Sequence, residues 1–260
     1  MLTLPEIEKN YPVNLRGYKR FLLREYLQCK ILQIIFDSKY AGELIFLGGT
    51  CLRIVHGNQR FSEDLVFDHF QLKENVFDNI SNLIVKKIEI EGYVVEMKTE
   101  FKDAYYCYIR FPKILYQEGM SGYQEEKMLI QLDTEPQGID FKPVGHILNR
   151  FDIFTQINIT PLDILLAQKF YAILNRNRNK GRDFFDVIFI LSMIDSPNYD
   201  YLQRKANIQD ARELKAQVLD KCSKIDMKEM AKDVQPFLFD PDGVKKILSF
   251  IEYIKQAKLI

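Results

Sequence analysis

The chain has 260 residues with 36 basic and 36 acidic side chains, a length that suits one large domain or two small ones. Its balanced charge excludes a protein that wraps nucleic acid over its whole surface, so any such contact must use a local patch. No run approaches the roughly 18 apolar residues of a membrane helix, and the N-terminus lacks a signal peptide's basic and apolar regions. We therefore expect a cytoplasmic protein without a membrane partner.

The cysteines argue against two further classes of protein. The chain has four of them and only three histidines, with no Cys-x-x-Cys pair. Disulfide frameworks and zinc sites both use organised Cys or Cys/His spacings, which are absent from this sequence. We expect buried free thiols at Cys29, Cys51, Cys107 and Cys222.

The first 134 residues combine helical and strand-like patterns. Apolar residues at helical spacing predict a helix over 15–38 and an amphipathic one over 73–91. The short apolar run 43–47 ends at Gly48-Gly49-Thr50 and is typical of a buried strand. A short helix over 50–56, with Thr50 as its cap, is expected next. Further strand-like runs follow at 64–70, 93–101, 104–112 and 127–134.

Beyond Pro161 the pattern is helical, with segments at 161–175, 182–194, 209–222, 226–235 and 241–257. We find no strand there, and the segment 135–160 is expected to be a linker. The sequence thus predicts an α/β (α+β) protein. Residues 1–150 form an α/β half with a mixed sheet and flanking helices, and residues 151–260 form an all-helical half.

Two glycines stand where the first expected strand meets the short helix. Gly48 and Gly49 have no Cβ, so a phosphate can approach the backbone N–H groups of a helix start. The Thr50 hydroxyl would add a donor, although a plain turn also explains the two glycines. The segment Arg60-Phe-Ser-Glu-Asp64 favours phosphate binding, because it puts an arginine, a serine and a carboxylate at the next strand.

Together these segments resemble the signature of the nucleotidyltransferase superfamily, a Gly-Gly-Ser/Thr helix start followed by a strand bearing Asp-x-Asp. The motifs GGTxLR at 48–53 and RFSEDL at 60–65 are similar to the AbiEii-type toxins of abortive-infection (type IV) toxin–antitoxin systems. The lysine-bearing helix at 166–176 and the segment Gly181-Arg-Asp-Phe-Phe-Asp186 are similar to two further family elements. These pieces span 46–186, about half the chain, in the family's order.

The resemblance implies transfer of a nucleoside monophosphate from an NTP to an RNA acceptor, tRNA being the expected one, with Mg²⁺ or Mn²⁺. It also implies a cognate antitoxin repressor encoded nearby, and a helical half that contributes Lys169 and Asp183 to the cleft. The residues that it assigns to NTP binding are Gly48, Gly49, Thr50, Arg60, Ser62 and Lys169. Those that it assigns to catalysis are Asp64, Lys169 and Asp183.

The family's Asp-x-Asp pair falls on positions 64 and 66, and position 66 in this chain is Val66. Residues i and i+2 of a strand point the same way, which suits two carboxylates that hold one metal ion. Asp68 lies about 13 Å from Asp64 along an extended strand, too far to replace the missing ligand. A third carboxylate is expected on an adjacent strand; Asp133 is the candidate, and a solvent-facing strand end is the alternative.

Two explanations account for Val66. A valine has no lone pair and puts an apolar surface where a divalent ion should sit. The chain is then either a natural pseudoenzyme or one that carries a substitution inactivating a toxic enzyme. The completeness of the surrounding motif favours inactivation, and we predict that Val66→Asp creates divalent-ion binding.

Lys169 lies on an apolar helix, where a lysine usually extends to the surface. The resemblance implies instead that its ammonium group holds the triphosphate. Asp183 and Asp186 are three residues apart and share a helix face. The family match favours Asp183 as the functional carboxylate, while Asp186 would cap the helix or pair with Arg182. The basic run 175–182 either contacts RNA or NTP phosphates or forms a solvated loop.

Two other functions are compatible with this fold. One is a non-catalytic protein that binds nucleotide or RNA, and Val66 is the feature in its favour. The other is transfer of a nucleotide to a small molecule such as an aminoglycoside. The Arg182-Asp183 element and the helical second half disfavour that reaction.

Overall fold

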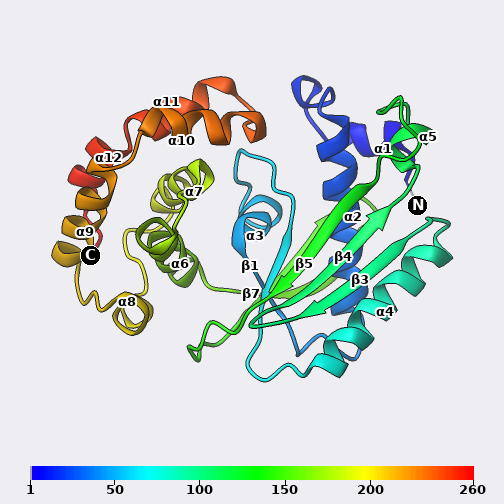
Figure 1. The fold of residues 1–260 in the computed structure, drawn as a ribbon, viewed down its shortest axis with the longest axis horizontal. Coiled ribbons are helices and arrows are strands. Elements are labelled where there is room, and N and C mark those ends of the chain that lie inside the picture. The colour runs from blue at the N-terminus through cyan, green and yellow to red at the C-terminus, as the bar shows by residue number, and fades with distance from the viewer. Residues whose placement is uncertain (1) are drawn as a thin grey trace. The chain divides into compact units, whose positions relative to one another are not determined.

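The computed structural model describes residues 2–260 and contains two compact units (Figure 1). The first unit holds the residues up to His56 and Ser62–Ile159, and the second holds Gly57–Phe61 and Thr160–Ile260. The predicted α/β fold class is confirmed, because a mixed sheet with flanking helices builds the first unit and helices build the second. The division falls at Ile159, later than the expected residue 150, and the segment with Arg60 groups with the helical unit.

One mixed sheet contains the seven strands of the first unit, in the order β3-β4-β5-β2-β1-β7-β6. β1 pairs antiparallel with β2 and parallel with β7, while β2 pairs parallel with β5. The motif-bearing strands therefore lie in the middle of the sheet. The strands are β1 (Ile45–Leu47), β2 (Leu65–Asp68), β3 (Glu96–Phe101), β4 (Tyr105–Phe111), β5 (Met128–Thr134), β6 (Val144–Arg150) and β7 (Ile153–Ile159).

The sheet has one buried face and one more open face. On β5, Ile130 and Leu132 are fully buried, whereas Gln131 and Asp133 on the opposite face are half-buried. Helices α2 (Lys19–Phe36) and α4 (Glu74–Ile90) pack against the sheet and supply the apolar partners of the buried face (Figure 1). The remaining helices of this unit are α1 (Leu4–Lys9), η1 (Val13–Leu15), α3 (Gly48–Ile54) and α5 (Ile114–Gln117).

A buried ion cluster connects α2, α3 and β6. Glu25 is 2% exposed and accepts hydrogen bonds from Arg53 Nε at 2.9 Å and from the Tyr11 hydroxyl at 2.8 Å. It also pairs with Arg150. A buried carboxylate requires such partners because desolvation penalises its charge. The cluster fixes the orientation of α3, the helix that begins at the glycine pair.

The segment 135–160, expected to be a linker, instead contains the hairpin of β6 and β7. Along β7 the buried Ile153 and Ile157 alternate with the exposed Phe154 and Gln156, as a half-buried strand requires. The burial of this strand depends on its parallel pairing with β1, where Ile159 lies opposite Phe46. Such a long-range pairing has no local signal in the sequence.

The helical unit contains α6 (Leu162–Asn175), α7 (Gly181–Leu191), α8 (Tyr199–Ala206), α9 (Ala211–Ser223), α10 (Met227–Val234), η2 (Gln235–Phe237), η3 (Pro241–Gly243), α11 (Val244–Leu248) and α12 (Phe250–Gln256). The helix expected at 241–257 is divided into three, with a break at Ser249. Helix α8 was not predicted, because half of its residues have charged or amide side chains. The side chain of Asn198 caps it by accepting from the backbone N–H of Tyr201.

Gly181 allows α7 and α10 to approach each other closely. A Cβ on Gly181 would lie 1.9 Å from the carbonyl oxygen of Met230, and its own N–H donates to Asp233 Oδ2 at 2.8 Å. The glycine that opens the Gly181–Asp186 segment thus has a packing function. As expected, all four cysteines are free and buried. Within residues 2–260, no helix combines the length and the hydrophobicity needed to cross a membrane.

Candidate functional site

The junction of β1 and α3 is built around Gly48. Helix α3 begins at this residue, whose φ of +80° is a conformation that glycine adopts freely and other residues adopt at a cost. A Cβ on Gly48 would lie 3.3 Å from Val66 Cβ, so the glycine backbone packs directly against the side chain at position 66. The position that the family pattern assigns to a carboxylate therefore borders the glycine turn.

Thr50 does not cap α3, contrary to the expectation from sequence. The N-cap residue is Leu47, and Thr50 lies inside the helix, 1% exposed. Its Oγ1 lies 2.5 Å from the carbonyl oxygen of Asp64 and 2.8 Å from Ser62 Oγ. Since a hydroxyl has one proton, Thr50 donates to the carbonyl and Ser62 donates to Thr50. The threonine thus holds the segment that carries Asp64.

Helix α2 holds the same segment from another direction. Gln28 Nε2 donates to the carbonyl oxygen of Glu63 at 2.7 Å, and Arg24 forms a 2.8 Å ion pair with the Glu63 carboxylate. Gln28 is 1% exposed, so its hydrogen bonds lie in the interior of the unit. Asp64 therefore stands on a segment that two helices fix, immediately before β2. Sequence reasoning did not identify Gln28, whose partner lies 35 residues away.

Two carboxylates lie on neighbouring chain segments at this place. Val66 on β2 is the register partner of Asp133 on β5, and Asp64 stands two residues before Val66. Burial, with a contribution from the negative charge of Asp64, raises the pKa of Asp133 to about 6, although a 2.7 Å hydrogen bond from Gln131 Nε2 opposes the shift. The structure thus brings the two predicted carboxylates within electrostatic reach of each other, and Val66 follows Asp64 on β2 as the register partner of Asp133.

This donor set fits one divalent ion and does not fit a pair. Mg²⁺ in phosphoryl-transfer sites is held by one or two carboxylates together with substrate oxygens, and Asp64 and Asp133 supply two. Within residues 2–260, no cluster of three or more His, Cys, Asp or Glu side chains is arranged to hold a metal ion. The valine side chain supplies no oxygen at the place where a third ligand would complete the set.

Asp68, which the sequence places too far from Asp64 to act as a metal ligand, has a structural role. It is 1% exposed, and its Oδ1 accepts the backbone N–H groups of His69 at 2.7 Å and of Gln137 at 2.9 Å. The carboxylate thereby ties the end of β2 to the chain that follows β5.

In the helical unit, Arg60 and Lys169 share one buried carboxylate. Asp186 is fully buried and accepts from Arg60 Nε at 2.7 Å and from Arg60 Nη2 at 2.6 Å, a two-point contact. Lys169 Nζ lies 2.8 Å from Asp186 Oδ2, the oxygen that Arg60 Nη2 also contacts, and Asn58 Nδ2 donates to Asp186 Oδ1 at 2.8 Å. Burial opposes ionisation, but the charges of Arg60 and Lys169 prevail and lower the pKa of Asp186 to about 2.

Asp183 is the second partner of Lys169. Lys169 Nζ lies 2.9 Å from Asp183 Oδ1, and Arg176 Nη1 lies 2.9 Å from Asp183 Oδ2. Both carboxylates of the Gly181–Asp186 segment thus meet the lysine of α6, as their shared helix face predicts. Asp186 pairs with Arg60. One alternative from the sequence, a pair between Asp186 and Arg182, is therefore wrong. The contribution of Asn58 was missed, because this residue lies in none of the predicted motifs. Arg176 was expected as part of the basic run 175–182 and not as a partner of Asp183.

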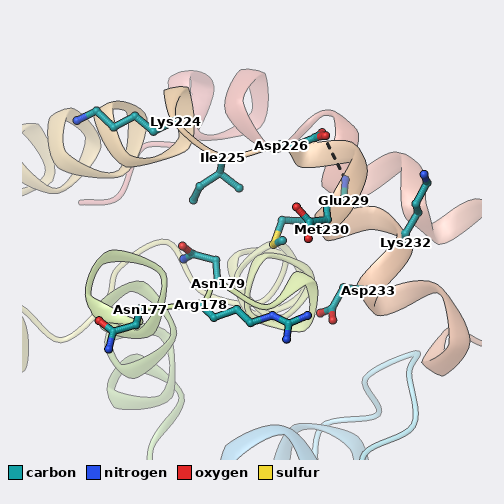
Figure 2. Close-up of a pocket in the computed structure, with 10 residues that line it drawn as sticks. All are labelled: Asn177, Arg178, Asn179, Lys224, Ile225, Asp226, Glu229, Met230, Lys232 and Asp233. Atoms are coloured by element: carbon teal, nitrogen blue, oxygen red, sulfur yellow. Dashed lines mark hydrogen bonds between the residues drawn. The ribbon is translucent and has the colours of Figure 1, made fainter.

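The basic run 175–182 borders a pocket of about 490 Å³ within the helical unit (Figure 2). Arg178 and Asn179 line one side of it, and residues from the end of α9 through α10 line the other. That opposite wall mixes Lys224 and Lys232 with the acidic side chains Asp226, Glu229 and Asp233. The loop therefore faces both signs of charge, which differs from the uniformly basic surface of an RNA-binding patch.

Known proteins resemble this chain in sequence pattern and in fold. A model of the family described as nucleotidyl transferase AbiEii toxin, type IV toxin–antitoxin system, matches residues 30–249. The crystal structure of JHP933 from Helicobacter pylori has a TM-score of 0.56 at 18% identity, covering 92% of this chain and 93% of that one. MenT4, a nucleotidyltransferase toxin of Mycobacterium tuberculosis, has a TM-score of 0.58 at 14% identity, with coverages of 98% and 90%. At these identities the likeness concerns the fold. No curated protein matches the chain.

Proposed function

Because the match over residues 30–249 shows that the chain belongs to the AbiEii family of nucleotidyltransferase toxins, we propose that it transfers a nucleoside monophosphate from an NTP to a hydroxyl group of an RNA, with tRNA as the acceptor. The observation that carries the proposal is the contact of the Gly48 turn with position 66 on β2, the strand that Asp64 precedes and that pairs with β5 at Asp133. Nucleotidyl transfer needs charge stabilisation at the transferred phosphate, and two carboxylates that can hold a metal ion stand beside the glycine turn.

The glycine turn is the proposed place for the NTP phosphates. Gly48 and Gly49 carry no side chain of their own, so phosphate oxygens can approach the backbone N–H groups there, with Val66 as the neighbouring side chain at Gly48. Ser62, half-buried beside Thr50, would donate its hydroxyl to a phosphate oxygen once it exchanges its present partner. Thr50 contributes through the position of the Ser62–Asp64 segment, because its own hydroxyl is already used.

Asp64 and Asp133 would hold a divalent cation, Mg²⁺ or Mn²⁺, at the transferred phosphate. When bound, such an ion neutralises charge that develops on the phosphoryl oxygens. Both carboxylates approach that place from fixed backbone: Asp64 from the segment held by α2 and α3, and Asp133 from β5. Val66 withholds one expected ligand, so we propose that this chain is an impaired form of an otherwise complete transferase.

Lys169 is the proposed phosphate ligand of the helical unit. An ammonium group has three N–H donors, and Asp183 and Asp186 each take one. The third N–H would donate to a phosphate oxygen. The contacts with Asp183 and Asp186 would fix the direction in which this N–H points. In this arrangement Asp183 acts by holding Lys169 and Arg176. Arg60, assigned to the NTP by family resemblance, acts by holding Asp186.

Membership of the family also bears on a protein partner, the antitoxin. Membership of a type IV toxin–antitoxin family implies a cognate antitoxin. We propose that this antitoxin is a repressor encoded near the toxin. Growth arrest by the active toxin, and its reversal by co-expression of the neighbouring gene product, would be the cellular readouts.

Transfer of label from each α-labelled NTP to total tRNA in the presence of Mg²⁺ tests the proposal. Val66→Asp should transfer label, and the chain with Val66 should transfer at least about a hundredfold less, since a metal ion supplies several kcal/mol of transition-state stabilisation. The double variant Asp64→Asn with Val66→Asp is the control and should be inactive. Absence of transfer from Val66→Asp to any RNA offered would overturn the proposal.

Val66 also favours a second candidate, a protein of the same fold that binds nucleotide or RNA without transfer. Such a protein would bind nucleotide equally well with Mg²⁺ and with a chelator, and Val66→Asp would not tighten the binding. Equilibrium binding of a labelled NTP under both conditions separates the two functions. Tighter binding by Val66→Asp with Mg²⁺ alone supports the transferase.

A further inference from the structure

The open face of the sheet carries a row of aromatic side chains that starts beside Asp133. In the register of the sheet, Tyr106 on β4 lies opposite Asp133 on β5, and Tyr108 lies opposite Gln131. Both tyrosines are half-buried, and they alternate with Cys107 and Ile109, which are fully buried on the other face. The charge of Asp133 contributes, after burial, to a raised pKa of Tyr106, so the phenol lies within electrostatic reach of that carboxylate.

The two rings are stacked and nearly parallel to each other. Their centroids are 6.4 Å apart and their planes differ by 13°. The guanidinium of Arg110 lies 5.5 Å from the Tyr108 centroid. Lys98 on β3 is the register partner of Tyr108 and is ion-paired at 2.7 Å with Glu100, the register partner of Tyr106. Tyrosine is a good strand former in any sheet. Parallel rings with a guanidinium beside one of them, on a face that helices α2 and α4 leave open, are in addition what stacks the bases of single-stranded nucleic acid.

The order of strands places the two tyrosines on the side of Asp133 that faces away from the glycine turn. The Gly48 turn lies at β1, next comes β2 with position 66, then β5 with Asp133, and then β4 with the tyrosines. In phosphoryl transfer the attacking and leaving oxygens stand roughly in line on opposite sides of the phosphorus. If the pyrophosphate leaves on the side of the glycine turn, the acceptor hydroxyl enters from the side of β5 and β4.

We propose that Tyr106 and Tyr108, with Arg110, form a stacking platform for the unpaired end of the acceptor RNA. The platform would bind two bases of a single strand and direct its terminal hydroxyl toward Asp133. It favours a single strand over a duplex, because the bases of an A-form helix are stacked on one another and their faces are not available to a protein ring. This inference rests on the proposed function for the identity of the acceptor, but the binding itself requires no transfer.

Fluorescence anisotropy of an end-labelled eight-nucleotide RNA, without NTP and with a chelator present, tests the platform independently of catalysis. The wild-type chain should bind the single strand more tightly than the blunt duplex of the same sequence. The double variant Tyr106→Leu with Tyr108→Leu retains apolar bulk on the strand, and its dissociation constant should rise at least about tenfold, as expected when two stacked bases lose their aromatic partners. The double Phe variant keeps both rings and should bind within about threefold of wild type.

A matched control uses two tyrosines elsewhere in the same unit, Tyr116 and Tyr123, which are 45% and 78% exposed. Their double Leu variant should bind RNA as the wild type does, and thermal melting verifies that each variant folds.

Two results would overturn the proposal. One is that the folded double variant Tyr106→Leu with Tyr108→Leu binds the single strand as tightly as the wild type does. The other is that the wild type binds the duplex and the single strand with equal affinity. The proposal is also overturned if the double Leu variant of Tyr106 and Tyr108 binds a labelled NTP more weakly but binds RNA as the wild type does. The two rings would then bind the nucleotide and not the RNA. Failure of label transfer with an intact RNA-binding difference contradicts the proposed reaction and leaves the platform standing.

Discussion

Val66 lies on β2 with the Gly48 backbone on one side and Asp133 as its partner on the next strand. The motif predicts all three positions as parts of a site, because strand alternation and the strand–glycine–helix order are local features. The same reasoning failed for Thr50, whose hydroxyl contacts the Asp64 carbonyl instead of the helix end. A hydroxyl beside a helix start is compatible with either contact, and only the packed chain decides between them.

Gly48→Ala tests the close packing at the turn. The alanine must adopt a φ near +80° and its Cβ must fit 3.3 Å from Val66 Cβ, so we expect a loss of roughly 1–3 kcal/mol in the free energy of unfolding. Urea denaturation measures it. Gly42→Ala is the matched control, since nothing lies within 4 Å of its added Cβ and its φ is not positive. Equal effects of the two substitutions would contradict this account of the turn.

At the scale of elements, helices α6 and α7 are joined by charge as well as by apolar packing. Asp186 on α7 forms ion pairs with Lys169 on α6 and with Arg60 in the segment Gly57–Phe61. The shared face of Asp183 and Asp186 was predictable from the helical repeat. The partner of Asp186 was not, because Arg60 precedes it by 126 residues and the pairing exists only in the folded unit.

Asp186→Asn should destabilise the helical unit by about 3–5 kcal/mol, because it leaves the buried Arg60 and the largely buried Lys169 without a common countercharge. Chemical denaturation followed by circular dichroism measures the loss. The control is Asp220→Asn, which removes the exposed ion pair with Lys224 and should cost less than about 1 kcal/mol. A small effect at Asp186 would mean that solvent reaches the pair and that the ion cluster does not hold the two helices together.

At the scale of the whole molecule, the sequence predicted the α/β class and most of the helices, because their apolar spacing is a local property. It missed β6 and β7, whose burial depends on the pairing of β7 with β1. The predicted site residues divide between the two units: the glycine turn and the carboxylates Asp64 and Asp133 belong to the first, and Arg60, Lys169 and Asp183 to the second. Motif order predicted both sets as site residues, whereas the ion pairs around them required the structure.

In the proposed function, position 66 is the missing ligand of an otherwise complete transferase site. Isothermal titration of Mg²⁺ into the chain with Val66 and into Val66→Asp, each with a non-hydrolysable NTP, tests it most directly. We predict at least about tenfold tighter Mg²⁺ binding by the Asp variant, as a third carboxylate on a hard cation should give. The gain should disappear in the double variant Asp64→Asn with Val66→Asp. Identical titration curves for Val66 and Val66→Asp would contradict the claim.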